Sequence, residues 1–590
     1  MEQQSSNGPQ DTPPLKLRKA CDFCRQAKIR CEKTDGAPSC GACDARSIAC
    51  IVSPRAQTTV AASRPSAADT PSYISRRQWS KAFLYDWIYG DTRSRDLLDA
   101  PHLWRDFVRK DCRKTVEQTI TRLAKFEDLA LRDTGSPQPT GPVHVFRPLP
   151  AEGELLKIVL TFSESTVPTL PLFREEIQRW LAERTYLDRG VTEDLPTWAS
   201  LNIVLALGYK YHLLRYPDSV DDRTKCEGYL KNALDTIPRL ILEPPCIVGV
   251  EALLGMVVLI SCSLELPYTY SLLAVAIRKA RTLGINRADI PRHEGAAPVA
   301  SERLTRIFWA GYIMDQMTCS PQGLAPCEDD DNFEIDLPQP GNDAAGTITL
   351  PNGFRLPLFQ HTCSLSIIKA RIFKFLYSSK ATTDANRRIS VIQDLESELR
   401  DWRNSVHPEC EESLERMEQT SFSRLAIVML LLSYHHSVIT LYRAAYLSPD
   451  SALEFPSAWT SACIRSARKT VHLVRYFPVH ATLGIRSLLT YVFTSFGMFT
   501  LHILDDPWAE SAQDDLSSLK ELYTFISNLL QANSYLPADR QQIFAYMLRV
   551  CRYHLDSAER AIHGVESVDG FYSDGNPESV EQTEGYPCGA

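Results

Sequence analysis

Residues 21–50 read CDFCRQAKIRCEKTDGAPSCGACDARSIAC, and this short stretch holds six cysteines. One spacing, Cys-x2-Cys-x6-Cys, occurs twice in register. The cysteines are Cys21, Cys24, Cys31, Cys40, Cys43 and Cys50. A Cys-x2-Cys pair brings two thiolates close enough to bind one tetrahedral zinc ion. Paired units of this kind are typical of metal sites. The stretch therefore predicts a small domain that folds around zinc.

The number of thiolates indicates how the metal is bound. Six thiolates complete two four-coordinate shells only if two of them bridge both ions. The symmetry of the repeat favours Cys21 and Cys40, the first cysteine of each half, as the bridges. Such a site is closed and structural. The alternatives are redox cysteines or a disulfide knot. A knot needs an oxidising compartment and a secretory signal, and the opening residues, MEQQSSNGPQDTPP, have no apolar core of that kind.

The two halves of the repeat differ in charge. The first half holds Arg25, Lys28 and Arg30 between its second and third cysteines, with no acid. The matching residues 44–49 of the second half hold one cation and one acid. Residues 16–33 carry seven Lys or Arg against two acids, although the whole chain has a net charge of −8. A basic head on an acidic body is typical of a protein that binds nucleic acid at one end.

This pattern resembles the DNA-binding domain of the fungal Zn2Cys6 binuclear zinc-cluster transcription factors. The resemblance implies two Zn2+ per chain, bound by the six cysteines. It also implies that a short helix of the first half reads a CGG triplet in the major groove, largely through Lys28. Further DNA contacts are expected from Arg18, and phosphate contacts from Lys19, Arg25 and Arg30. Members of the family often dimerise, so a homodimer on paired half-sites is a further hypothesis.

The rest of the chain has a helical period. Apolar residues recur at helical spacing in several stretches, such as Leu201, Val204, Leu205 and Gly208, and each stripe needs partner helices. One strand-like signal, a hairpin within Thr347–Leu356, surrounds a Pro-Asn-Gly turn. The longest uncharged apolar run, Ala252–Leu264, is too short to span a bilayer and predicts a buried helix. The predicted fold class is mostly α: a small zinc-cluster domain, a flexible linker and a large all-α regulatory domain.

Composition marks the expected boundaries. Residues 53–77 are rich in Ser, Ala, Thr and Pro, residues 134–150 hold five prolines, and the chain after residue 560 has six acids and no Lys or Arg. The expected divisions are a disordered N-terminus (1–15), the Zn2Cys6 domain (16–55), a flexible linker (56–79), a helical segment with a Pro-rich linker (80–150), the all-α domain (151–560) and an acidic disordered tail (561–590).

The helical part has a resemblance of its own. Ala274–Arg287, Arg306–Pro338 and Tyr434–Arg443 are similar to the fungal-specific transcription factor domain, which implies a regulatory role. The matching positions are Trp309, Tyr312, Asp315, Gly323, Pro326 and Pro338. The four adjacent acids at 328–331 are expected to form a solvated turn, since they cannot all converge on one metal ion. His435 and His436 are expected to be satisfied core or surface histidines.

These observations predict a nuclear, DNA-binding transcription regulator, and the basic run at 16–19 is typical of a nuclear import signal. Activation of RNA polymerase II genes is expected. The acidic tail is expected to recruit coactivators or, as an equal alternative, only to keep the protein soluble. The helical domain is expected to regulate by packing on the head, by binding a small-molecule effector or by binding proteins. No membrane partner and no enzymatic activity are expected, because no catalytic motif is present. Two alternatives stay open: a zinc-cluster scaffold of a corepressor, and a helical enzyme with a DNA-tethering head.

Overall fold

The computed structural model describes the following residues: 31, 39–44, 50, 144–183, 193–261, 266–287, 298–319, 325–339, 345–378, 381, 384–447, 457–482, 484–532 and 538–563. The chain divides into two compact units, residues 1–73 and 74–590. The predictions for the N-terminus, for the linker 56–79, for the helical segment 80–143 and for the tail beyond residue 563 lie outside the described residues. They stay predictions.

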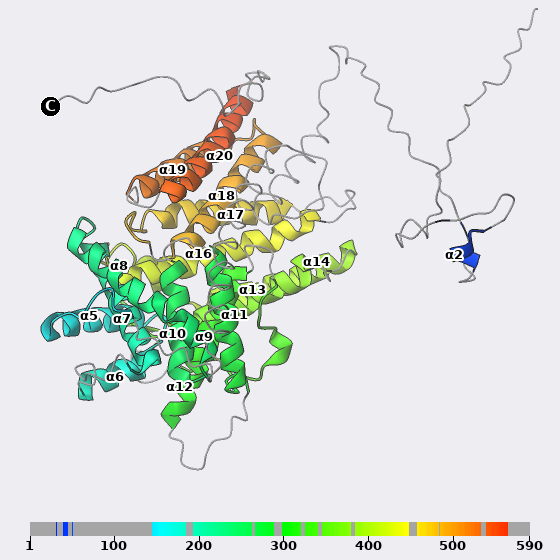
Figure 1. The fold of residues 1–590 in the computed structure, drawn as a ribbon. Coiled ribbons are helices and arrows are strands. Elements are labelled where there is room, and N and C mark those ends of the chain that lie inside the picture. The colour runs from blue at the N-terminus through cyan, green and yellow to red at the C-terminus, as the bar shows by residue number, and fades with distance from the viewer. Residues whose placement is uncertain are drawn as a thin grey trace, which may run out of the picture. The chain divides into compact units, whose positions relative to one another are not determined.

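The first unit has one described helix, α2 (Gly41–Asp44). The second unit begins with a helical group that is drawn in cyan to green in Figure 1. Its members are α5 (Glu152–Thr166), α6 (Arg174–Glu183), α7 (Leu195–Arg215), α8 (Val220–Asp235), α9 (Ile237–Leu242), α10 (Ile247–Ser261), α11 (Leu266–Thr282) and α12 (Pro298–Cys319). Within this group α7 packs against α5, α8 and α10, so α7 is its central helix.

A middle segment connects this group to the last helices. It comprises η4 (Asp330–Asn332), β1 (Ile348–Thr349), β2 (Arg355–Leu356), α13 (Leu358–Ile372), the π-helix η5 (Phe373–Tyr377), α14 (Ala385–Ser405) and α15 (Glu409–Glu412). The last group, yellow to red in Figure 1, comprises α16 (Phe422–Arg443), η6 (Ala444–Leu447), α17 (Ser457–Val474), α18 (Ile485–Asp505), α19 (Ala512–Ala532) and α20 (Ala538–His563). Helix α13 packs on α12 and on α16, and thus joins the two groups.

Helix starts follow from capping residues. Ser219 accepts a hydrogen bond from the backbone N–H of Asp222 at 3.3 Å, and α8 begins at the next residue. Asp384 caps α14 in the same way, with 2.7 Å between its Oδ1 and the N–H of Arg387. Each cap satisfies an N–H group that the helix itself leaves unpaired.

The hydrophobic stripes predicted from the sequence are buried. Leu201, Val204 and Leu205 in α7 have 0% exposure, and Ile392, Leu395, Leu399 and Trp402 in α14 are also buried. Apart from Glu251, helix α10 is mostly apolar and is buried along most of its length, which confirms the buried helix predicted from Ala252 onward. The predicted mostly α fold is therefore confirmed for the described residues of 151–560.

Helix α10 also shows a close approach that only glycine allows. An added Cβ at Gly255 would lie 2.4 Å from the ring of Phe173. Phe173 is buried and has a φ of 62°, in the left-handed region, so its backbone position is itself constrained. The missing side chain at residue 255 therefore lets the loop before α6 pack directly on α10.

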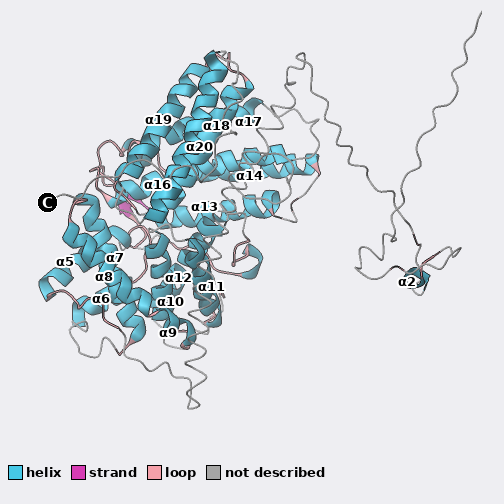
Figure 2. Cartoon of the chain, turned by 45° about the horizontal axis from the view of Figure 1, so that its top comes forward, coloured by secondary structure: helices cyan, strands magenta, loops and turns pink. Residues whose placement is uncertain are grey.

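The predicted hairpin is present. Strand β1 pairs antiparallel with β2, with Ile348 opposite Leu356, and the described residues hold no other sheet (Figure 2). Its turn uses Gly353 at a φ of 85°, and Asn352 Oδ1 accepts a hydrogen bond from the N–H of Phe354 at 2.9 Å. Asn-Gly chemistry therefore gives a turn here, as the sequence predicts.

Two described helices are long and apolar enough to span a bilayer by length and composition. They are α16 and the segment Ser487–Asp505 of α18. In each, 67% of the most apolar window is buried inside the helical unit. That burial is typical of core helices in a water-soluble fold.

Candidate metal centre

A single turn of helix brings two predicted zinc ligands together. The backbone N–H groups of Cys43 and Asp44 both donate to the carbonyl oxygen of Cys40 at 3.0 Å, which starts α2 directly after Cys40. Ser39 Oγ donates to the carboxylate of Asp44 at 3.1 Å and holds the turn from outside. Residues three apart on a helical turn lie on the same side. The thiols of Cys40 and Cys43 therefore face one point.

Cys50 completes a group of three. The sulfur atoms of Cys40, Cys43 and Cys50 all lie within 4.8 Å of one another. The first two cysteines are buried and Cys50 is half-buried. The backbone N–H of Cys40 lies 3.4 Å from the sulfur of Cys50, and donation from such an N–H stabilises a thiolate.

The donor set fits zinc. A tetrahedral ion with Zn–S bonds of about 2.3 Å separates its sulfur ligands by roughly 3.8 Å, and the observed spread accommodates that separation. All three ligand atoms are soft sulfurs, which zinc accepts readily. None of the cysteines that the structure describes is in a disulfide, an observation that disfavours the knot. The cluster therefore fits a metal site.

The structure tests only part of the predicted site. Cys31 is half-buried. The other predicted site residues lie outside the described part of the chain: Cys21, Cys24, Arg18, Lys19, Arg25, Lys28 and Arg30. The six-cysteine ligand set, the two bridging thiolates and the DNA contacts therefore stay predictions.

The motif residues of the helical part form a structural clamp. Tyr312 is fully buried, and its hydroxyl donates to Asp330 Oδ1 at 2.6 Å. The indole N–H of Trp309 donates to the carbonyl oxygen of Asp336 at 2.9 Å. The ring of Phe333 packs against both aromatic rings, with centroids 5.5 Å from Tyr312 and 5.8 Å from Trp309. The aromatic face of α12 thus holds the acidic segment that follows it.

The prediction of a solvated acidic turn at 328–331 is confirmed for Asp329 and Asp331, whose side chains are 49% and 78% exposed, and is wrong for Glu328. Glu328 is 5% exposed, and its carboxylate accepts hydrogen bonds from the guanidinium of Arg281, one of them 2.7 Å long. The backbone N–H of Glu328 donates to Asp315 at 2.9 Å. Lys374 bridges Asp329 and Asp331 at 2.8 and 2.6 Å. The partners of the four acids lie on three elements, so the run fastens residues 328–331 to α11, α12 and η5.

The prediction of satisfied histidines is wrong for His436. This residue is buried, and neither ring nitrogen has a hydrogen-bond partner among the described residues. Burial, together with the positive charges of Lys369 and Arg443, holds the pKa of His436 well below 6.5, so the imidazole is neutral. Sequence reasoning missed the cavity that this residue lines, because its walls come from elements far apart in the chain.

Two regions of the chain match known protein families. Residues 19–59 match the Fungal Zn(2)-Cys(6) binuclear cluster domain, and residues 201–404 match the Fungal specific transcription factor domain. The first match includes all six cysteines of the repeat, and the second includes the clamp between α11, α12 and the acidic turn.

Similar proteins carry related descriptions. An ABC-transporter-regulating transcription factor of Aspergillus oryzae is 27% identical over 71% of this chain and 49% of its own length. A protein of the same description from Aspergillus fumigatus is 26% identical over 70% of this chain and 48% of its own length. The Fusaridione A cluster transcription factor of Fusarium heterosporum is 24% identical over 75% of this chain and 89% of its own length.

The chain thus spans about half the length of the two Aspergillus relatives. These relatives are named as transcription factors, and no relative named here is an enzyme. With a cysteine cluster that fits a metal site near the N-terminus and a helical domain of the matching type behind it, the chain is similar to the fungal Zn2Cys6 transcription factors in both matched regions.

Proposed function

We propose that this chain is a zinc-dependent regulator that binds DNA at CGG-type triplets through the first half of its cysteine repeat. The observation that carries the proposal is the convergence of Cys40, Cys43 and Cys50 within 4.8 Å, in the half of the repeat that lacks the cluster of cations. If the second half of the repeat folds around metal, the first half, which has the same cysteine spacing, would present Arg25, Lys28 and Arg30 on an equivalent lobe.

Six thiolates would hold two Zn2+: Cys21, Cys24, Cys31, Cys40, Cys43 and Cys50. Bound zinc supplies folding free energy to a segment that is too short to bury a core of its own. In this proposal the cysteines therefore position the lobe, and the basic residues of the chain make the contacts with DNA.

Recognition follows from hydrogen-bond chemistry. A lysine ammonium donates to guanine O6 and N7 in the major groove, which assigns base reading to Lys28. Arg18, Lys19, Arg25 and Arg30 would neutralise phosphates, which fixes orientation and adds a salt-dependent affinity. The net charge of −8 for the whole chain opposes binding of DNA elsewhere on the protein.

The wider role of the chain is part of the same proposal. The protein would act in the nucleus on RNA polymerase II genes, as an activator whose acidic tail recruits coactivators, with a homodimer placing two heads on paired triplets. Promoters of ABC transporters are the first targets to examine, because two relatives are named for regulating such genes.

The test is selection of bound duplexes from randomised DNA by the purified full-length chain, with zinc and with a chelator. We expect enrichment of CGG-bearing duplexes, lost on chelation. Lys28→Ala should lower the affinity for the selected duplex by about 10- to 100-fold and abolish the preference, as loss of one good base contact does.

Arg46→Ala is the matched control, because Arg46 is the cation at 44–49 in the second half of the repeat. This variant should keep the CGG preference. Equal selectivity of Lys28→Ala and the wild type would contradict the base-reading role. Zinc-dependent folding with only sequence-blind, salt-sensitive binding would favour the alternative of a zinc-cluster scaffold that acts through protein contacts.

A further inference from the structure

The turn between α18 and α19 is exposed and acidic. It comprises residues 506–511, and Trp508 at its centre is 79% exposed. The N–H of Trp508 donates to Asp506 Oδ1 at 3.2 Å, and the N–H of Ala509 donates to the carbonyl oxygen of Asp506, also at 3.2 Å. These bonds within the turn fix its backbone, while the side chains of Asp506, Trp508 and Glu510 stay exposed. A second protein can therefore reach this part of the chain.

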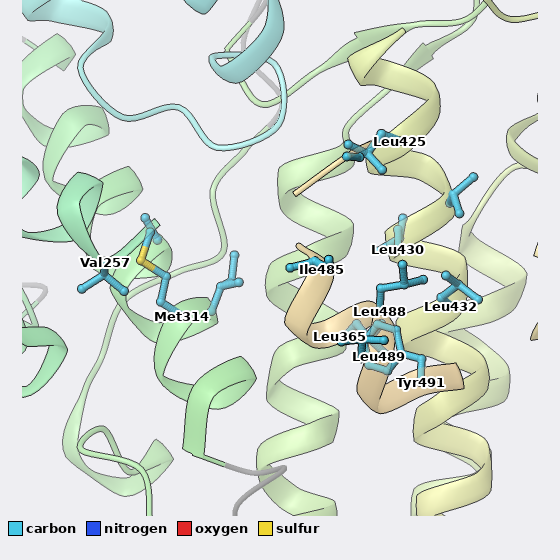
Figure 3. Packing of buried hydrophobic residues seen from close by; sticks show 14 of the residues in the cluster. Val257, Met314, Leu365, Leu425, Leu430, Leu432, Ile485, Leu488, Leu489 and Tyr491 are labelled. Atoms are coloured by element: carbon cyan, nitrogen blue, oxygen red, sulfur yellow. The ribbon is translucent and has the colours of Figure 1, made fainter. Parts of the chain in front are cut away.

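The helix that leads into the turn is fixed in the core. Figure 3 shows Leu488 and Leu489, near the start of α18, beside leucines of α16, and the two helices pack against each other. Both leucines are buried. Helix α18 ends at Asp505, so the turn follows directly on a packed element. A chemical change in the turn would therefore act on packed helices.

Ser511 is the last residue of the turn and is half-buried. Its hydroxyl donates to Asp515 Oδ2 at 3.3 Å, which is longer than the usual O–H···O range of about 2.5–3.0 Å. Its carbonyl oxygen accepts a hydrogen bond from the N–H of Asp515 at 2.9 Å, directly before α19 begins. The hydroxyl of Ser511 is therefore only weakly held.

Acids surround Ser511 in the sequence. Residues 505–515 include five acids and no Lys or Arg. Glu510 directly precedes the serine, Asp514 is the third residue after it, and both acids are exposed. Protein kinases distinguish their substrates partly by the charge pattern of the segment they bind. This pattern fits a kinase whose substrate cleft is basic.

The serine can enter such a cleft at a small structural cost. The hydroxyl must leave Asp515 to meet the γ-phosphate of ATP, so the first turn of α19 has to open. Helix ends open with little free energy. Of residues 512–514, Gln513 and Asp514 are already exposed, and Ala512 is buried. Opening this turn therefore exposes one small side chain.

Two basic side chains contact the same carboxylate as Ser511. Arg468 in α17 donates to Asp515 Oδ1 at 2.6 and 3.0 Å, and Nδ1 of His502 in α18 lies 2.9 Å from Oδ2. The side chain of Arg468 is 43% exposed, so it has room to turn toward a new acceptor. A phosphate on Ser511 would lie beside these groups and at the N-terminus of a 21-residue helix, and both favour negative charge. The cluster thus offers donors to a phosphoserine.

We propose that Ser511 is a phosphorylation site for an acid-directed serine kinase that uses ATP. Ser511 Oγ forms a bond to the γ-phosphorus, the bond from that phosphorus to the β-phosphate oxygen breaks, and ADP leaves. The hydroxyl proton passes to the catalytic base of the kinase. The phosphoserine then accepts hydrogen bonds from Arg468 and His502, which changes how α19 is connected to α17 and α18. The reaction needs neither zinc nor DNA, so the inference is independent of the proposed function.

The test is incubation of the purified full-length chain with ATP and casein kinase 2, an acid-directed serine kinase, followed by digestion and mass spectrometry of the phosphopeptides. We expect phosphate on Ser511, and loss of this phosphopeptide in Ser511→Ala. Asp514→Asn should lower the initial rate at Ser511 by about tenfold, because it removes a charge that the cleft of the kinase binds. Ser517→Ala is the matched control and should leave this rate unchanged, since Ser517 is also exposed but has Lys520 as the third residue after it.

A second measurement tests the side chains that receive the phosphate. The ³¹P resonance of the phosphoserine is followed against pH in the folded protein and in urea. Because Arg468 stabilises the doubly charged phosphate, the titration midpoint should lie at least about 0.5 pH unit lower in the folded protein. Absence of phosphate on Ser511, while the same kinase modifies an acidic control peptide, would overturn the proposal. Equal rates for the wild type and Asp514→Asn, or equal midpoints in the folded and unfolded protein, would also overturn it.

Discussion

Replacing Arg281 by methionine tests whether the acidic turn after α12 is fixed by a buried ion pair. The guanidinium of Arg281 donates twice to Glu328, whose side chain is 4% exposed, while that of Arg281 is 24% exposed. The hydrogen bonds to Glu328 raise the pKa of Arg281. Breaking a buried pair costs about 3–5 kcal/mol of unfolding free energy. Because Arg281 still meets water, we expect the lower end of this range, about 3 kcal/mol.

The assay is urea unfolding of the full-length chain at pH 7, followed by far-UV circular dichroism, for Arg281→Met, Glu328→Gln and the double variant. The unfolding free energies lost by the two single variants should sum to at least about 1.5 kcal/mol more than the loss of the double variant. This difference measures the coupling energy of the ion pair. Arg400→Met is the matched control, since its partner Glu396 lies on the same exposed helix face, and it should cost less than about 0.5 kcal/mol. Equal losses for Arg281→Met and Arg400→Met would refute the reasoning.

Three further substitutions follow from the packing. Asp515 is fully buried, and although burial raises its pKa, hydrogen bonds from His502 and Arg468 hold that pKa below 3.8. The stabilisation is therefore complete above pH 4 and is lost as the pH falls through the folded-state pKa. Asp515→Asn should lower the unfolding free energy by about 3 kcal/mol at pH 7, and less at pH 3, as urea titrations at both pH values would show. Gly255→Ala should destabilise the protein by about 1–2 kcal/mol, since overpacking exceeds the gain in helix propensity. Gly153→Ala, where nothing lies within 4 Å of the added carbon, should instead stabilise it by about 0.5–1 kcal/mol in the same assay.

Features that depend on local chemistry could be predicted from the sequence. The Cys-x2-Cys spacing brings Cys40 and Cys43 to one side of a single turn, whatever the remainder of the chain does. The Asn352–Gly353 turn also needs only its own backbone preferences. Helical stripes such as Leu201, Val204 and Leu205 predict burial without naming the partner helix. For these features, the residues that determine the local structure lie within a few positions of one another in the sequence.

The burial of Glu328 in the acidic turn could not be predicted in this way. Four adjacent acids look solvated, because their partners are remote: Arg281 precedes Glu328 by 47 residues, and Lys374 follows Asp329 by 45. Whether a carboxylate meets water or a guanidinium is decided by how α11, α12 and η5 pack.

The cavity that His436 lines was also invisible in the sequence. Its lining residues come from five elements between Met317 and Tyr491. His436 follows His435 in a helix with an ordinary core pattern, and no local signal separates a paired histidine from an unpaired one. Only the packed structure shows that no described side chain reaches its ring nitrogens.

The central claim is that six thiolates hold two zinc ions and that this metal-folded head binds DNA. The most direct measurement is native mass spectrometry of the purified full-length chain in complex with its selected duplex, before and after chelation. We expect two zinc ions per chain in the DNA-bound species, and loss of the complex when they are removed. A chain that binds the selected duplex with one zinc ion, or with none, would contradict it.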